Sequence, residues 1–239
     1  MGVDVIISDE ENVSVTKREG KLLYTLAKKC RGYGVIVEIG SWKGRSTIYL
    51  AKGSKAGNSV RVYSIDPHTG SSEHKEKFGE VWTFDEFMKN IKSARVDDII
   101  TPIVKTSEEA AKEFDKPVEL IFIDGAHEYE FVKKDFEMWF PKVVEGGIMA
   151  FHDTGWPSPD FPGPKRVVRD FVYFSKHFKD VKFVDSITYG IKVSNNSIFD
   201  RIKNVSMYIL NRLYEKLAML RLPGPIRSVG KKIFRMITG

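Results

Sequence analysis

The chain has 239 residues, 42% hydrophobic and 29% charged, as in a soluble globular protein with one sizeable core. It has no run of about 18 apolar residues, so we expect no membrane-spanning helix, and its first residues lack the basic start and apolar stretch of a signal peptide. The single cysteine, Cys30, excludes an internal disulfide and a cysteine-based metal cluster. These features predict an intracellular, cytoplasmic protein.

The net charge of +6 is concentrated near the C-terminus. Residues 196–239 contain nine Lys or Arg and two acidic residues and carry +7, whereas residues 1–195 carry −1. The basic character therefore belongs to a tail. It gives no reason to expect a nucleic-acid-binding body.

Helix and strand patterns alternate along residues 16–193. Thr16 and Glu19 have capping-box spacing and precede apolar residues at helical spacing, which predicts a helix from Thr16 to Lys29. Further helices are predicted after residue 45 and over 83–94, 107–114, 129–140 and 165–177. Strands are predicted over 35–39, 60–65, 99–104, 118–123 and 147–151, with an antiparallel pair over 181–186 and 189–193. This alternation predicts a doubly wound, mainly parallel seven-stranded α/β sheet that binds ligands at the carboxyl ends of its strands.

The first strand ends in an acid followed by a glycine-rich turn. Glu38, Gly40 and Gly44 have the spacing Glu-x-Gly-x-x-x-Gly, and the glycines allow a sharp turn and close approach to a ligand. An acid at this place favours a cationic ligand. The absence of Gly-x-Gly-x-x-Gly disfavours a nicotinamide-dependent oxidoreductase. The alternative is that the glycines serve only a tight turn.

Polar residues also follow the second and third strands. Asp66 lies 22 residues after Gly44, close to the offset at which an acid accepts hydrogen bonds from a ribose diol, although it could simply begin the turn at Pro67. Thr106 and Ser107 could contact a base edge or only cap the following helix, with Ser107 as the expected cap. The segments 67–82 and 155–164, with Trp82 and Trp156, could cover a substrate.

The fourth and fifth strands end in acids and histidines. Asp124 and His127 follow one strand, and His152 and Asp153 follow the other. Because these ends are neighbours in a doubly wound sheet, we expect the four side chains to meet. Such groups could bind magnesium, calcium or manganese. The alternative is that they only satisfy loose backbone groups at the strand ends.

Four segments together resemble the class I S-adenosylmethionine-dependent methyltransferases. They are 38–44, 64–67, 121–129 and 146–154. More narrowly, they resemble the branch of macrocin-type and mycinamicin-type sugar O-methyltransferases. The resemblance covers about residues 14–195, which implies a methyltransferase domain over 1–195 and a basic amphipathic helical tail over 196–239.

The resemblance implies roles for the candidate residues. The methionine end of S-adenosylmethionine and its ribose and adenine would be held by Glu38, Gly40, Ser41, Gly44, Asp66, Thr106, Ser107 and Asp124. His127 would be the general base. Magnesium or another divalent cation would be bound by Asp124, His152 and Asp153. His152 stands where the family has an acid. Three alternatives therefore stay open: His152 turns away from the site, another metal is used, or catalysis needs no metal.

The function implied is O-methylation of a sugar or glycoconjugate hydroxyl. The sulfonium already carries an activated methyl group, so the protein must position the acceptor and remove its proton. Two alternatives stay open: a catechol-type small-molecule O-methyltransferase, and a non-catalytic cofactor-binding assembly protein.

The tail contains apolar residues at helical spacing. They are Ile198, Phe199, Ile202, Val205, Ile209, Leu210, Leu213, Leu217 and Leu220. We expect this helix to dock on the body or on a second subunit of a homo-oligomer. The alternative is peripheral contact with the anionic inner face of a membrane.

Overall fold

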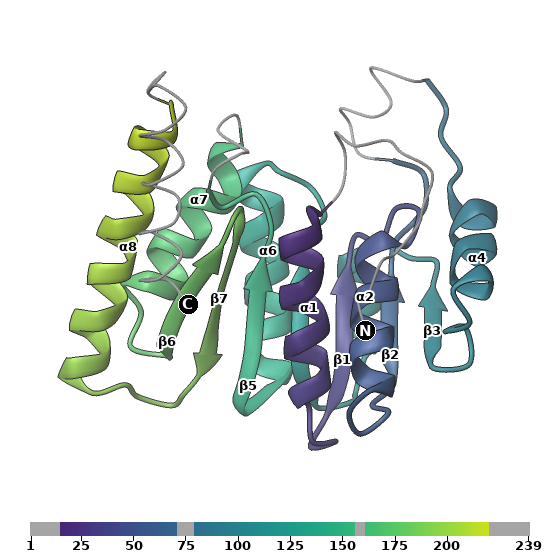
Figure 1. Ribbon diagram of the computed structural model, residues 1–239, viewed down its shortest axis with the longest axis horizontal. Coiled ribbons are helices and arrows are strands. Elements are labelled where there is room, and N and C mark those ends of the chain that lie inside the picture. Colours follow the sequence, from purple (N-terminus) through teal and green to yellow (C-terminus); the bar gives the residue numbers. More distant parts are fainter. Residues whose placement is uncertain (1–14, 71–78, 156–160, 220–239) are drawn as a thin grey trace.

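The computed structural model of the chain describes residues 15–70, 79–155 and 161–219 (Figure 1). At its centre is a seven-stranded sheet with the order β3-β2-β1-β4-β5-β7-β6. The strands are β1 (Val35–Ile39), β2 (Val62–Ile65), β3 (Ile100–Ile103), β4 (Val118–Ile123), β5 (Val143–Phe151), β6 (Phe178–Val184) and β7 (Ile187–Lys192). Strands β1 to β5 are parallel, and β7 is antiparallel to β5 and β6. The predicted fold class and the antiparallel closing pair are confirmed.

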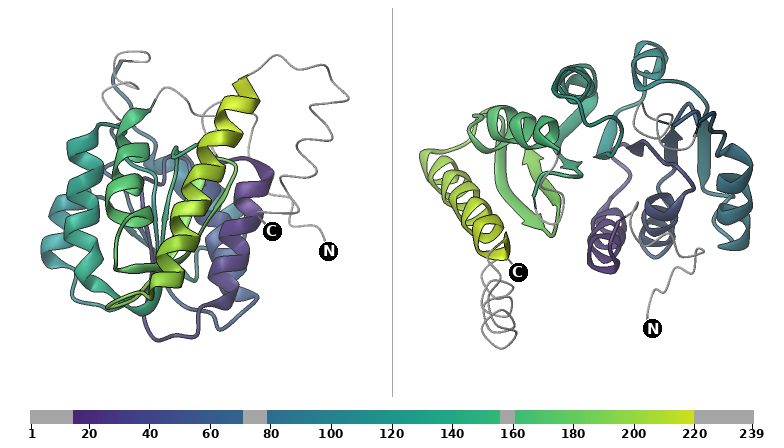
Figure 2. Two further views of the ribbon diagram at one scale, coloured as in Figure 1. Left: turned by 90° about the vertical axis from the view of Figure 1, so that its left-hand side faces the viewer. Right: turned by 90° about the horizontal axis from the view of Figure 1, so that it is seen from above.

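Helices cover both faces of the sheet (Figure 2). They are α1 (Lys17–Lys29), α2 (Arg45–Lys55), α4 (Phe84–Ser93), α5 (Ser107–Glu113), α6 (Tyr129–Trp139), α7 (Pro162–Val168) and α8 (Ile198–Met219), with the short turns η1 (Phe140–Lys142) and η2 (Arg169–Tyr173). Side chains of α1, α2 and α4 pack in one core, and those of α5, α6 and α7 in the other. Ile36 belongs to the first core and Val37 to the second, which explains why β1 is apolar on both faces.

The parallel strands place their carboxyl ends at one edge of the sheet. Ile39, the last residue of β1, pairs with Ile65 of β2 on one side and with Ile123 of β4 on the other. The chain order reverses beside β1, because β2 lies on one side of it and β4 on the other. A ligand crevice forms outside the strand ends at such a switch point.

Several element boundaries differ from the sequence expectation, including those of β5, α7 and α5. Strand β5 begins at Val143 instead of Gly147, because a register irregularity against β4 lets the strand continue through Gly146, whose φ is +81°. The helix predicted over 165–177 is divided in the structure: α7 ends at Val168, and the π-type turn η2 continues only to Tyr173. Helix α5 is capped by Thr106, not Ser107, because Thr106 has an extended backbone and its side chain accepts a hydrogen bond from the N–H of Glu109.

Helix α8 runs beside the outer strand β6 (Figure 2). The buried Asn204 side chain accepts a hydrogen bond from the N–H of Val181 (3.2 Å) and donates one to the carbonyl of Phe178 (2.8 Å). Backbone groups at the edge of the sheet are thereby paired with α8. Among the described residues, no helix combines the length and hydrophobicity needed to cross a bilayer.

Helix α1 is tied to the β6–β7 turn through a buried acid. Glu19 closes the predicted capping box with Thr16 and also accepts hydrogen bonds from the backbone N–H (2.8 Å) and hydroxyl (2.6 Å) of Ser186. Its second oxygen lies 3.6 Å from Nε2 of His152, at the end of β5. Burial alone would raise the pKa of Glu19, but His152, Ser186 and Thr16 outweigh it and lower that pKa to about 2.

Replacing Glu19 with Gln should destabilise the chain in a pH-dependent manner. A folded-state pKa near 2, against 4.5 for the ordinary group, contributes roughly 3 kcal/mol to the free energy of unfolding. This contribution is fully present above pH 4.5 and is lost as the pH falls toward 2. Chemical unfolding should therefore show a large difference between wild type and Glu19→Gln at pH 7 that shrinks below pH 4. Glu109→Gln in the exposed capping box of α5 is a matched control. It should lower the free energy of unfolding much less than Glu19→Gln does. A pH-independent difference would contradict this account.

Candidate functional site

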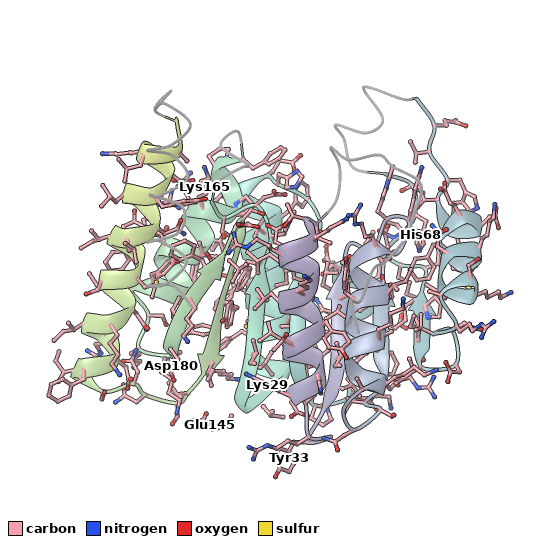
Figure 3. All side chains as sticks on the ribbon, in the orientation of Figure 1. Lys29, Tyr33, His68, Glu145, Lys165 and Asp180 are labelled. Carbon is pink, nitrogen blue, oxygen red and sulfur yellow. The ribbon has the colours of Figure 1, made fainter. Side chains whose placement is uncertain are left out.

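The carboxyl ends of the parallel strands gather at one end of the molecule. Figure 3 shows His68, which follows β2, and Lys165 of α7 at this end, whereas Tyr33, which precedes β1, lies at the opposite end. The predicted site residues lie at the ends of β1 to β5 or in the turns that follow these strands.

The loop after β1 lies directly against the ends of β2 and β4. Gly40 has a φ of +82°, and a Cβ at this position would lie 2.1 Å from the carbonyl oxygen of Asp124. The N–H of Gly40 donates to the carbonyl of Ile65 (2.9 Å), and the N–H of Asp124 donates to that of Ile39 (2.8 Å). Only glycine permits this approach, and Gly44 then begins α2 with a φ of +89°. The predicted loop geometry is present.

Asp66 holds this loop by accepting backbone hydrogen bonds. Its Oδ2 accepts from the N–H groups of Ser41 (2.8 Å) and Trp42 (2.7 Å), and its Oδ1 accepts from the N–H of His68 (2.7 Å). The side chain therefore joins the ends of β1 and β2. Its contact with a ribose stays a prediction.

Glu38 is a fully buried acid beneath the loop. One carboxylate oxygen accepts a hydrogen bond from the Thr47 hydroxyl of α2. Burial, reinforced by the nearby charges of Asp124 and Asp66, raises the pKa of Glu38 to about 8. In the part of the chain described, Glu38 Oε1 and the buried Ser41 Oγ have no hydrogen-bond partner. Two such orphan oxygens fit the cationic methionine end of S-adenosylmethionine.

Thr106 and Ser107 both have structural partners. Thr106 is the exposed N-cap of α5, and Ser107 accepts a hydrogen bond from the indole N–H of Trp139 (2.9 Å). The cap given by the sequence as the alternative is therefore realised at Thr106, whereas Ser107 has a different structural partner. Their contact with adenine stays a prediction.

The ends of β4 and β5 bring Asp124, His152 and Asp153 together. Nδ1 of His152 lies 2.9 Å from Oδ1 of Asp124 and 3.2 Å from Oδ2 of Asp153. Burial alone would lower the pKa of His152, but the carboxylates of Asp124, Asp153 and Glu19 raise it well above its usual value. For the Asp124 carboxyl, burial is the largest effect and raises its pKa.

The same three groups fit a divalent cation. One ligand atom from each lies within 4.8 Å of the others. Metal–ligand bonds of about 2.1 Å place neighbouring octahedral ligands about 3 Å apart, which matches the two distances from His152. Two carboxylates and an imidazole nitrogen suit manganese, iron, cobalt or zinc better than magnesium, which prefers oxygen ligands.

His127 lies on the other side of Asp153. Its Nε2 is 2.9 Å from Oδ2 of Asp153, and its ring stacks on Phe161 with centroids 3.8 Å apart. A Cβ on Gly163 would lie 2.1 Å from the carbonyl oxygen of His127, so the start of α7 packs closely on this segment. Part of the predicted covering loop thus contacts the candidate base, while residues 71–78 and 156–160, with Trp156, lie outside the described residues.

Sequence reasoning missed Glu19 as a neighbour of the site. The sequence indicates only a capping-box acid. In the structure Glu19 faces Nε2 of His152, whereas Asp124 faces Nδ1 of the same ring. The sequence gives little indication of this second contact, because the capping box of Thr16 and Glu19 already accounts for the acid. Its second role depends on Ser186, which is 167 residues away in sequence.

Comparison with known proteins shows what the domain is similar to. Residues 37–154 match the family model described as a methyltransferase domain. An uncharacterised protein of Sinorhizobium fredii is 32% identical over 121 residues, which are 50% of this chain and 13% of that protein. An uncharacterised protein of Acanthamoeba polyphaga mimivirus is 28% identical over 140 residues, 56% of this chain and 59% of that protein. The chain thus spans less than two thirds of these curated relatives.

Solved structures share the fold. Cofactor-bound Rv0187 from MTB has a TM-score of 0.59 and 19% identity, covering 77% of this chain and 84% of that one. The O-methyltransferase TomG from Streptomyces achromogenes, in complex with SAM, has a TM-score of 0.56 and 18% identity, covering 77% and 83%. CalS11, described as a TDP-rhamnose 3'-O-methyltransferase, has a TM-score of 0.51 and 18% identity, covering 74% and 77%. Residues 37–154 therefore match the methyltransferase domain model, and the chain shares the Rossmann-like fold of these solved structures.

Proposed function

We propose that the chain is an S-adenosylmethionine-dependent O-methyltransferase that acts on a sugar or glycoconjugate hydroxyl. The observation that carries this proposal is the contact between the Gly40 loop and Asp124, because it puts a cofactor-type loop beside the His127–Asp153 pair. The methyltransferase domain model supports the reaction class. The names of TomG and CalS11 support oxygen as the acceptor atom, and that of CalS11 supports a sugar.

The cofactor would lie over the loop after β1. Gly40 and Gly44 let the backbone approach the methionine end, and the orphan oxygens of Glu38 and Ser41 receive its ammonium group. Asp66 would accept hydrogen bonds from the ribose hydroxyls. Adenine would lie near Thr106 and Ser107, and Asp124 would border the methyl group.

His127 would remove the proton from the acceptor hydroxyl. When Nε2 carries the hydrogen that is donated to Asp153, Nδ1 is the basic nitrogen of the ring. Asp153 then orients the ring and stabilises the imidazolium that forms after proton transfer, as a carboxylate does in a His–Asp pair. The stacked Phe161 restricts the ring further.

A divalent cation bound by Asp124, His152 and Asp153 would lower the pKa of the acceptor hydroxyl, as metals do for bound water. These side chains would also fix the acceptor oxygen near His127, because Asp153 contacts both histidines. Glu19 would hold the far side of the His152 ring.

Cofactor binding should release protons near neutral pH. Glu38 has a raised pKa of about 8, so it is mostly protonated at pH 7, and a cationic ligand beside it lowers that pKa and expels the proton. Calorimetric titration with S-adenosylmethionine at pH 7, in buffers of different ionisation enthalpy, should show net proton release. Glu38→Gln should abolish this release. A buffer-independent enthalpy for the wild type would contradict the assigned role of Glu38.

Manganese should bind to the Asp124, His152 and Asp153 group. Calorimetric titration with Mn²⁺ should give a saturable signal for the wild type, and Asp153→Asn should weaken binding about tenfold or more because a ligand is lost. Asp98→Asn, which alters an exposed acid paired with Lys55, should leave the affinity unchanged. Equal binding by the wild type and Asp153→Asn would exclude this site.

His127→Ala should reduce methyl transfer by about 100-fold or more, because proton removal by a positioned base contributes that much. Formation of S-adenosylhomocysteine would be measured by mass spectrometry with nucleotide sugars, glycosides and catechols as acceptors. Binding of S-adenosylhomocysteine should be unchanged, and His177→Ala, which alters a histidine bonded to Ser194, should retain full turnover. Undiminished turnover of His127→Ala would remove His127 from the mechanism.

A further inference from the structure

Helix α8 contacts the body of the protein through polar side chains. Its buried residues include Asn204, Asn211 and Glu215, which recur on one side of the helix. Asn211 donates to the hydroxyl of Tyr173 (3.2 Å), and Glu215 is paired with Lys165 of α7 (2.8 Å). The expected docking on the body is observed, but polar residues make the most buried contacts.

The opposite side of α8 is apolar and exposed. Between 47% and 73% of the surface of six large hydrophobic residues is accessible: Ile198, Phe199, Ile202, Ile209, Leu213 and Leu217. At 3.6 residues per turn they form one stripe that faces away from Asn204 and Glu215. They are six of the eleven exposed large hydrophobic residues in the described part of the chain, so exposed apolar surface is concentrated here.

The charges on this outward half are all positive. Lys203 and Lys216 are exposed at the two margins of the stripe. The two acids of α8 lie elsewhere and are engaged. The carboxylate of Asp200 accepts hydrogen bonds from the N–H and hydroxyl of Ser197, and Glu215 lies between Lys165 and Arg212. An apolar stripe bordered by lysines, without an acid, is complementary to an anionic, partly apolar surface.

We propose that the outward face of α8 binds the surface of an anionic phospholipid bilayer. The stripe would enter the boundary between headgroups and acyl chains, while Lys203 and Lys216 would contact lipid phosphates. The sequence continues this character, because residues 220–239 contain Arg221, Arg227, Lys231, Lys232 and Arg235 and no acidic residue. The proposal concerns α8 alone and does not depend on methyl transfer.

A second copy of the chain is a poorer occupant of the same face. A two-fold axis near the middle of α8 would pair the helices in antiparallel fashion. The interface would then carry Lys203 and Lys216 of both copies along its margins, and the outward half has no acid to compensate these four positive charges. Like charges along one interface oppose association, whereas lipid phosphates neutralise them.

Vesicle flotation of the full chain tests this proposal. The wild type should float with vesicles of phosphatidylcholine and phosphatidylglycerol and remain at the bottom with phosphatidylcholine alone. Ile209→Asp/Leu213→Asp should weaken partitioning about tenfold or more, because two apolar contacts become charged. Raising the ionic strength from about 0.1 M to about 1 M should also weaken it, since the Debye length falls from about 10 Å to about 3 Å.

Two controls make the result specific to α8. Tyr33→Asp/Phe131→Asp introduces the same charge at exposed apolar residues elsewhere and should float like the wild type. Lys203→Gln/Lys216→Gln should weaken flotation without placing an acid on the helix, which covers the case in which the aspartate variant unfolds. Thermal unfolding of every variant shows whether its fold is retained.

Three outcomes would overturn the proposal. The wild type could fail to float with anionic vesicles, or the folded α8 variants could float as well as the wild type. In the third outcome, light scattering would show a wild-type dimer that Ile209→Asp/Leu213→Asp dissociates, with no vesicle binding, and the second copy would then be the occupant.

Discussion

The approach of Gly40 to the backbone of Asp124 is the contact on which the candidate site depends. It lets the loop after β1 lie against the end of β4 at the point where the strand order reverses. Hydrogen bonds from Gly40 to Ile65 and from Asp124 to Ile39 join the ends of three adjacent strands. The proposed cofactor half and acceptor half therefore form one continuous surface, and a side chain at position 40 would force them apart.

A second constraint is that several acids serve more than one partner. Asp66 fixes the loop after β1 through backbone N–H groups while occupying the position proposed for ribose recognition. Asp153 contacts both His127 and His152, and Glu19 caps α1 while facing His152. Because buried carboxylates require partners, the same interactions that stabilise the strand ends also orient the chemical groups. Stability and proposed chemistry are coupled at this end of the sheet.

The two sides of helix α8 differ in polarity: the buried side is polar and the exposed side is apolar. Asn204 pairs with backbone groups of the outer strand β6, a task that an apolar side chain cannot perform. Arg212 donates to the carbonyl of Thr154 (2.9 Å), next to Asp153, and so connects the helix to the candidate site. Polar contacts thus attach α8 to the domain and leave its apolar stripe outward, which gives the basic C-terminal region a surface for a partner.

The sequence by itself determined the parallel sheet, its antiparallel closing pair and the grouping of Asp124, His127, His152 and Asp153, because these follow from local periodicity and from residues at strand ends. Tertiary structure alone decided that Glu19 faces His152, that Thr106 caps α5 while Ser107 bonds Trp139, and that α8 docks by its polar side. Apart from the local Thr106 cap, these features depend on contacts between residues distant in sequence. Periodicity reveals that a helix has an apolar side, but only the backbone groups at the edge of β6 and Lys165 of α7 select which side faces the body.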